Sequence, residues 1–192
     1  MEKKHIITIA GKLGSGKSST ANRIAELLGY SRASTGDFMR SIAQVHGLSL
    51  EELSKLAETD PSIDKALDDN NRAVGEKSNI ILDSRLGFHF IPDSFKVFLE
   101  LDPLVAAERI LKDAAVNPNR YKETKAQFDT PEHIAQATAD RIASERKRYF
   151  ELYGITDHTA HSNFDLVIDT ATMPLEGVAQ KIVEEYNKWL AS

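Results

Sequence analysis

Apolar and polar residues follow one another along this chain in two patterns, short apolar runs and longer helical periods. The apolar runs predict five strands, and nearly continuous runs are typical of a parallel sheet covered on both faces. These predicted strands are residues 5–10, 31–34, 79–84, 95–101 and 164–169, of which 31–34 is the weakest. Because strands alternate with helices, the pattern predicts a doubly wound α/β fold, and we expect a single domain over residues 1–192.

Several predicted helices begin with a capping signal. Ser49 and Glu52 have the spacing of a capping box. The last helix is predicted by an apolar stripe that runs from Leu175 to Leu190. A capping residue followed by a proline, which suits the first helical turn, occurs at Asp60, Asp102 and Thr130.

Two stretches are longer than a simple alternation of strand and helix requires. Residues 35–78 hold two or three predicted helices between the second and third strands. Residues 112–130 are polar and poorly periodic, which indicates a mobile crossover. Inserts on a rigid sheet commonly carry substrate recognition or form lids. We therefore expect a helical insert over 35–78 and a lid over about 112–140.

The composition restricts the class of protein. Hydrophobic residues make up 41% and charged residues 28%, which supports a packed core. The net charge of −5 disfavours a general nucleic-acid or membrane-surface binder. The chain has no cysteine, and its first apolar run is too short for a signal peptide or a membrane span. We expect a soluble cytoplasmic protein whose partners are small molecules, with no nucleic acid, no membrane and no evident obligate protein partner.

Residues 11–18 read Gly-Lys-Leu-Gly-Ser-Gly-Lys-Ser and match the phosphate-binding pattern G-x-x-x-x-G-K-[ST]. The glycines allow backbone N–H groups to point inward around phosphate oxygens, and the following helix adds its positive dipole end. Lys17 can reach the β- and γ-phosphates, and the Ser18 hydroxyl can bind Mg²⁺. We expect a nucleoside triphosphate to be bound by Gly11, Gly14, Ser15, Gly16, Lys17, Ser18 and Ser19.

The rest of the chain does not fit a GTPase. A guanine-reading N-K-x-D motif is missing, because Asn187-Lys188 in the last predicted helix is followed by Trp-Leu. A pair of histidines, His158 and His161, lacks the companions of a metal site and is expected to lie in a surface loop.

Further motifs resemble the nucleoside-monophosphate kinases, and in particular the short cytidylate kinases. The similar segments are STGDFMR (34–40), ILDSRLGF (81–88), VFLELDPLVAAERI (97–110), DRIASERKRYFELYGI (140–155) and FDLVIDT (164–170), which together with the glycine-rich loop cover most of the chain. The resemblance implies a three-layer α/β P-loop kinase fold with a five-stranded parallel sheet, a helical monophosphate-binding insert and a mobile lid. Two positions depart from the family pattern: Ser84 replaces a usual glycine, and Lys12 replaces a small residue or proline.

An acceptor phosphate needs fixed cations, and arginine offers planar bidentate forks. The resemblance implies that Arg40 and Arg85 hold this phosphate and that Ser34 and Asp37 flank its pocket. Arg85 directly follows the end of a predicted strand, where doubly wound sheets bind ligands. Arg109, on the helix that leads into the polar stretch, is a further candidate contact to the substrate near the lid hinge.

The remaining candidates concern the metal and the transferred group. Asp83 ends the third predicted strand, where a carboxylate can orient Mg²⁺ opposite Ser18. On a helix, Arg141, Glu145 and Arg148 share one face. One interpretation is a solvated face in which Glu145 pairs with its neighbours. The resemblance favours the other, in which Arg141 and Arg148 are catalytic and close over the transferred phosphoryl group.

The glycine-rich loop predicts ATP binding, and the resemblance implies transfer of the γ-phosphoryl group of ATP to a pyrimidine nucleoside monophosphate, CMP or dCMP. A general base is not required, because the second pKa of such a phosphate is about 6. One alternative is a kinase for another small phosphate or for an alcohol, in which case Asp37 or Asp83 would have to act as the base. The other is a nucleotide-dependent switch without phosphoryl transfer.

Overall fold

The computed structural model describes residues 3–116 and 130–192. Within these residues, five strands form one sheet in the order β2-β3-β1-β4-β5, and every neighbouring pair is parallel. The strands are β1 (Ile6–Gly11), β2 (Ser31–Ser34), β3 (Ile80–Asp83), β4 (Phe95–Glu100) and β5 (Leu166–Asp169). All five lie at the predicted positions, which confirms the predicted parallel sheet.

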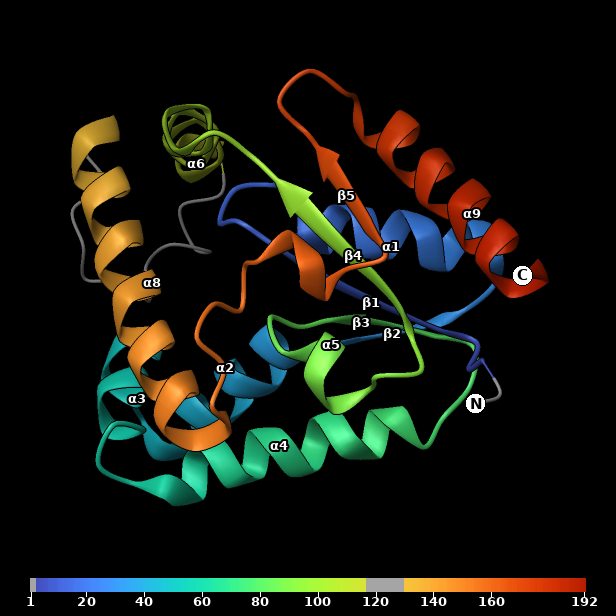
Figure 1. The fold of residues 1–192 in the computed structure, drawn as a ribbon. Coiled ribbons are helices and arrows are strands. Elements are labelled where there is room, and N and C mark those ends of the chain that lie inside the picture. The colour runs from blue at the N-terminus through green and yellow to red at the C-terminus, as the bar shows by residue number, and fades with distance from the viewer. Residues whose placement is uncertain (1–2, 117–129) are drawn as a thin grey trace.

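Helices cover both faces of this sheet, so the molecule has three layers (Figure 1). On one face, α1 and α9 pack together over the apolar side chains of β1 and β4. The opposite face is covered by α4 and α5. The helices are α1 (Lys17–Leu28), α2 (Thr35–His46), α3 (Leu50–Leu56), α4 (Pro61–Gly75), α5 (Gly87–Phe90), α6 (Pro103–Val116), α8 (Pro131–Tyr153), the short 3-10 helix η1 (His161–Asn163) and α9 (Leu175–Ala191).

The predicted capping residues act as predicted. Ser49 and Glu52 form a complete capping box at the start of α3. The carboxylate of Asp60 accepts a hydrogen bond from the backbone N–H of Ser62, which caps α4. Such side chains satisfy backbone N–H groups that have no partner within the helix, so they fix where each helix begins.

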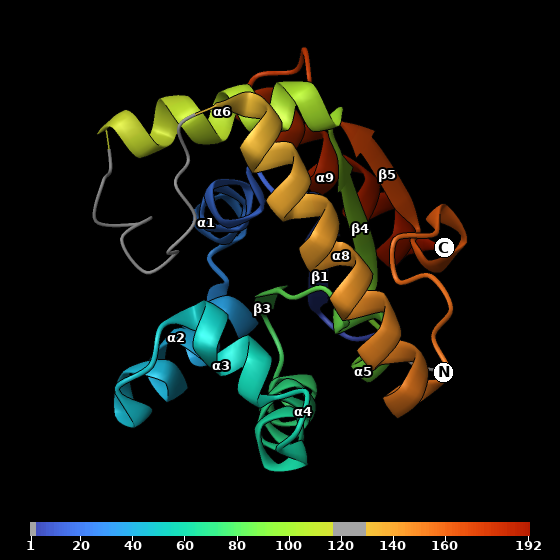
Figure 2. The same cartoon turned by 90° about the vertical axis from the view of Figure 1, so that its left-hand side faces the viewer.

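Three helices, α2, α3 and α4, form the predicted insert between β2 and β3. They share a small apolar core of their own, separate from that of the sheet: Ala43, Leu53, Ala57, Ile63 and Leu67. Figure 2 shows these helices grouped together, with α8 running from beside α6 at the top toward α5 and passing to one side of them. The insert is therefore placed opposite α8 at the open edge of the sheet.

The predicted lid at about 112–140 is described only at its two ends. Residues 112–116 complete α6, residues 131–140 begin α8, and residues 117–129 lie outside the described part. The two helices pack together through Ala107, Ile110 and Ile134. No helix in residues 3–116 or 130–192 combines the length and apolar character needed to span a membrane.

Candidate active site

The glycine-rich loop leaves the central strand β1 and enters α1 with little space around it. A Cβ on Gly11 would lie 2.5 Å from the carbonyl oxygen of Leu99 on β4, so no other residue fits there. Gly16, with a φ of 83°, directly precedes α1, and no side chain caps this helix in the described structure. The first N–H groups of α1 therefore face the loop without a side-chain acceptor, which suits an anion.

Lys17 extends back over this loop. Its Nζ donates to the carbonyl oxygens of Gly11 at 2.9 Å and Lys12 at 2.8 Å. Desolvation and the nearby Arg85 guanidinium lower the pKa of Lys17 to about 8, although Asp83 acts in the opposite direction. Burial is the main cause of this shift, and the positive charge of Arg85 adds to it; a bound anion would offset both effects.

Ser18 and Asp83 meet beside the loop as predicted. The Ser18 hydroxyl donates to the Asp83 carboxylate at 2.8 Å, and Asp83 is 8% exposed. A hydroxyl and a carboxylate are the hard oxygen ligands that Mg²⁺ prefers, and this ion usually keeps several waters and phosphate oxygens. Among residues 3–116 and 130–192, no group of three or more His, Cys, Asp or Glu side chains could hold a metal. The pair therefore fits an ion that is shared with a triphosphate rather than one held by the protein alone.

The strand register brings the start of the insert to the same place. Asp83 is paired with Ile9 of β1 on one side and with Ser34 of β2 on the other. Ser34 caps α2, since its hydroxyl accepts from the backbone N–H of Asp37 at 3.2 Å. Arg40, whose side chain is 46% exposed, pairs with Asp37 from the next turn of the helix. These three predicted acceptor residues therefore stand together beside Asp83.

Arg85 and Arg141 converge on one buried carboxylate. Glu145 Oε2 lies 3.0 Å from Arg85 Nε, and Glu145 Oε1 accepts from Arg141 Nε at 2.9 Å. Burial acts to raise the pKa of Glu145, but the two guanidinium groups hold it below its ordinary value. A small cleft between the P-loop and α8 is lined by all three side chains. The contact between Glu145 and Arg85 is a feature that the sequence did not reveal.

The other two predicted arginines lie elsewhere. Arg148 is 8% exposed and faces the insert, with its Nε 3.5 Å from Asp64 and its Nη1 3.4 Å from the Ser54 carbonyl oxygen. Arg109 donates to the carbonyl oxygen of Thr170 at 2.7 Å, in the segment that follows the edge strand β5. The structure does not group Arg109 with the acceptor candidates near β2, nor Arg148 with Lys17. Their predicted roles stay predictions.

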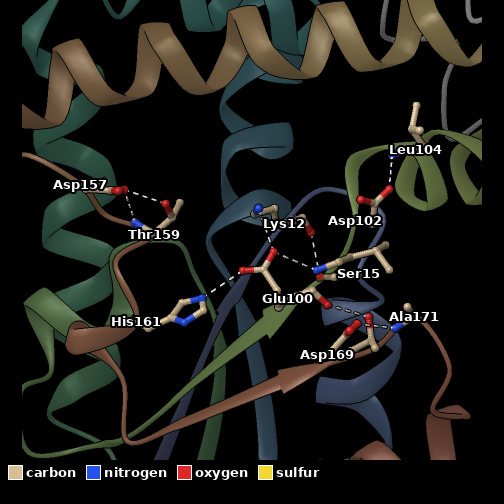
Figure 3. Close-up of polar contacts among 12 residues, drawn as sticks. Lys12, Ser15, Glu100, Asp102, Leu104, Asp157, Thr159, His161, Asp169 and Ala171 are labelled. Atoms are coloured by element: carbon tan, nitrogen blue, oxygen red, sulfur yellow. Dashed lines mark hydrogen bonds and ion pairs between the residues drawn. The ribbon is translucent and has the colours of Figure 1, made fainter.

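A second polar cluster ties the P-loop to the end of β4 (Figure 3). Lys12 Nζ lies 2.8 Å from one oxygen of Glu100, and His161 Nε2 lies 3.1 Å from the other. The carbonyl oxygen of Lys12 also accepts from the Ser15 hydroxyl at 2.7 Å. Lys12, which departs from the family pattern, is thus paired with a carboxylate in this structure.

The expectation of two surface histidines is wrong for His158. His161 is exposed, but His158 is 4% exposed and packs edge-on against the Tyr149 ring at 5.1 Å. Its Nε2 lies 3.9 Å from Glu145. Burial lowers the pKa of His158, so this ring favours the neutral form and packs as part of the wall behind Glu145.

Comparisons with known proteins agree with this geometry. Residues 7–128 match a family model described as an AAA domain. The chain is 35% identical over 178 residues to a cytidylate kinase of Methanosphaera stadtmanae, covering 92% of this chain and 95% of that protein. It is also 34% identical over 184 residues to an S-adenosylmethionine-dependent nucleotide dehydratase of Lacinutrix mariniflava, covering 95% of this chain but 36% of that protein.

A solved structure shares the fold. The shikimate kinase from Bacteroides thetaiotaomicron superimposes with a TM-score of 0.64 at 14% identity, covering 95% of this chain and 98% of that one. Fold, P-loop and relatives together define a P-loop kinase that catalyses nucleotide phosphoryl transfer. Within this class, the chain belongs to the cytidylate kinase family.

Proposed function

We propose that this protein transfers the γ-phosphoryl group of ATP to a pyrimidine nucleoside monophosphate, with CMP or dCMP as the acceptor. The observation that carries the proposal is that Arg85, from the end of β3, and Arg141, from α8, meet at Glu145 in a cleft beside the P-loop, where both guanidinium groups act to lower the pKa of Lys17. Three cations from separate segments suit the many negative charges of two nucleotides. The cytidylate kinase relative, which this chain matches along almost its whole length, supplies the acceptor class.

On the donor side, the P-loop N–H groups and Lys17 bind the phosphates of ATP. Ser18 and Asp83 would hold Mg²⁺, which neutralises phosphate charge when it is bound. Gly11 and Gly16 supply the tight turn and the uncapped helix start that this role requires.

On the acceptor side, Arg40 and Arg85 hold the monophosphate next to the γ-phosphate. An oxygen of the acceptor phosphate bonds to the γ-phosphorus, while the bond from that phosphorus to the β–γ bridging oxygen breaks and ADP leaves. The acceptor is already ionised at neutral pH because its second pKa is about 6, so no base is needed. Arg141 stabilises charge on the transferred group, and exclusion of water limits ATP hydrolysis.

An alcohol acceptor is less well supported. It would need an aspartate base, and the two candidates are engaged by other groups. Asp83 accepts the Ser18 hydroxyl. Although burial acts to raise the pKa of Asp37, Arg40 and Arg32 hold it below its ordinary value, which weakens it as a base.

The similarity to the nucleotide dehydratase does not favour a second function. It covers 36% of that protein, and almost the whole of the present chain aligns equally well with a cytidylate kinase of its own size. We therefore assign kinase activity to the present chain.

The proposal is tested by ADP formation from Mg-ATP with CMP, dCMP, UMP, AMP and GMP supplied separately, against a control without acceptor. We expect CMP or dCMP to give the largest acceleration. Arg85→Ala should raise the KM for CMP far more than Arg146→Ala, because Arg146 is a half-exposed residue of α8 that pairs with Asp157. If none of the five acceptors accelerates ADP formation although ATP binds, the proposed function is wrong.

A further inference from the structure

Asp64 and Arg148 form a buried pair between the insert and α8. Asp64 is 5% exposed and Arg148 is 8% exposed. Arg148 Nε lies 3.5 Å from Asp64 Oδ1 without the alignment of a hydrogen bond, and within the described residues this N–H has no hydrogen-bond partner. A buried donor without an acceptor is costly, so groups of this kind call for an explanation. A ligand that inserts at the pair can provide the missing acceptor.

On α8, the pair adjoins the candidate acceptor site. Arg148 follows Glu145 by three residues, so the two side chains share one face of the helix. Glu145 in turn contacts Arg85, which is proposed to hold the acceptor phosphate. Successive residues along this face thus lead from the phosphate end of the site to the insert.

On α4, a second set of contacts leads to the same place. Asn71 follows Asp64 by seven residues, or about two helical turns, and both are buried on one face of the helix. The Asn71 side-chain oxygen accepts from the Thr35 hydroxyl at 2.8 Å. Thr35 begins α2 directly after Ser34, at the start of the predicted monophosphate pocket. Contacts on α4 and residue spacing on α8 therefore connect Asp64 and Arg148 to the two ends of the candidate acceptor site.

We propose that Asp64 and Arg148 recognise the base of the acceptor nucleotide. Asp64 accepts a hydrogen bond from the 4-amino group of cytosine, and Arg148 donates to the adjacent ring nitrogen and carbonyl oxygen. This inference rests on the proposed function and names the residues that select the base.

The chemistry of the pair matches cytosine better than uracil. An ionised carboxylate only accepts hydrogen bonds and a guanidinium only donates them. Cytosine presents an amino donor next to acceptors, whereas uracil presents a carbonyl oxygen where cytosine has the amino group. A carboxylate facing that oxygen would lack a donor, which penalises UMP.

Asp64 is better placed for this role than its neighbour Asp68. The carboxylate of Asp68 already accepts from the Tyr153 hydroxyl at 2.7 Å. The guanidinium of Arg148 lies beside Asp64 but is not aligned for a hydrogen bond. Burial raises the pKa of Asp64, although the charge of Arg148 opposes this effect. A donor from the ligand would complete its surroundings.

The test compares kcat/KM for CMP and UMP at saturating Mg-ATP in the wild type, Asp64→Asn and Asp69→Asn. A carboxamide can present either its oxygen or its NH₂ group to the base, so Asp64→Asn should lower the CMP-to-UMP ratio by about 10- to 100-fold. Asp69→Asn is the matched control, because Asp69 lies on the same helix, 60% exposed and paired with Lys65. Its ratio should equal that of the wild type. Equal losses on both acceptors in Asp64→Asn would assign the residue a structural role and overturn the inference.

A second measurement needs no variant. The wild type is offered the monophosphate of 2-pyrimidinone riboside, which lacks only the 4-amino group of CMP. We expect kcat/KM to fall by about 10- to 100-fold relative to CMP. If the two acceptors are used equally well, the inference fails while the kinase function stands. If the wild type phosphorylates neither CMP nor UMP, the proposed function fails and the inference falls with it.

Discussion

Replacement of Glu145 by glutamine removes the carboxylate that Arg85 and Arg141 share. Both guanidinium groups lie about 3 Å from it, and Glu145 itself is 6% exposed. Glutamine has nearly the same shape but no charge, so Glu145→Gln isolates the electrostatic contribution. The guanidinium groups of Arg85 and Arg141 would then repel each other and Lys17 without the negative charge of Glu145 to compensate.

The expected cost follows from the surroundings of the pair. Breaking a fully buried ion pair costs about 3–5 kcal/mol. Here the arginine side chains are 27% and 42% exposed, so water replaces part of the lost interaction, and the glutamine oxygen can still accept one hydrogen bond. We expect a loss of about 1–3 kcal/mol in the free energy of unfolding, or about 3–8 °C in Tm for a chain of 192 residues.

The assay is thermal unfolding of the ligand-free protein and of the protein with saturating CMP. The phosphate of CMP supplies the negative charge that the variant lacks, so CMP should raise the Tm of Glu145→Gln more than that of the wild type. Glu151→Gln, an exposed substitution on the same helix, is the control and should change neither value. Equal Tm values for wild type and Glu145→Gln, with equal gains from CMP, would refute the view that Glu145 neutralises these arginines.

Two further predictions concern the P-loop. With the pKa of Lys17 at about 8, its positive charge is present below this pH and lost above it, so kcat/KM for ATP should fall above about pH 8, approaching tenfold per pH unit. At saturating ATP the bound phosphates stabilise the protonated form of Lys17, so kcat should decline only at higher pH. A kcat/KM for ATP that stays constant up to pH 10 would contradict a Lys17 pKa of about 8. Gly11→Ala places a Cβ 2.5 Å from the Leu99 carbonyl oxygen, whereas Gly29→Ala, also at positive φ, meets nothing within 4 Å. Urea unfolding should show Gly11→Ala to be less stable than Gly29→Ala by about 1–3 kcal/mol, and comparable losses would disprove the steric argument.

Local signals in the sequence predicted most of the fold. The strands β1, β3, β4 and β5 are short, mainly apolar runs, and the helix starts carry their own caps at Ser49, Asp60 and Thr130. The P-loop is equally local, because its glycines, lysine and serine occupy consecutive positions. Such features depend on neighbours in the chain, so the order of residues is enough to reveal them.

The contacts across the site could not be predicted in the same way. Glu145 lies four residues from Arg141, and that pairing is readable on one helix, but its contact with Arg85 depends on how α8 lies against the end of β3. Arg109 shows the same limit. Its place on a helix follows from the local pattern, but its hydrogen-bond partners, the carbonyl oxygens of Thr170 and Ala171, lie in the segment after β5. Long-range packing decides these positions.

His158 shows the same limit for burial. Two histidines three residues apart in a polar stretch look alike in the sequence, yet His161 is exposed while His158 is enclosed beside Tyr149 and Glu145. Burial of one ring follows from the path of the chain after α8, which no local pattern reports.

The central claim is that the γ-phosphoryl group of ATP passes to a nucleoside monophosphate and not to water. The most direct measurement uses ATP with a radioactive γ-phosphate, mixed with CMP, Mg²⁺ and the protein, and separates the labelled products. The account predicts labelled CDP in amounts equal to the ADP formed, and no label in CDP with Lys17→Ala. Label that appears only as inorganic phosphate, or stays in ATP although ATP and CMP both bind, would contradict it.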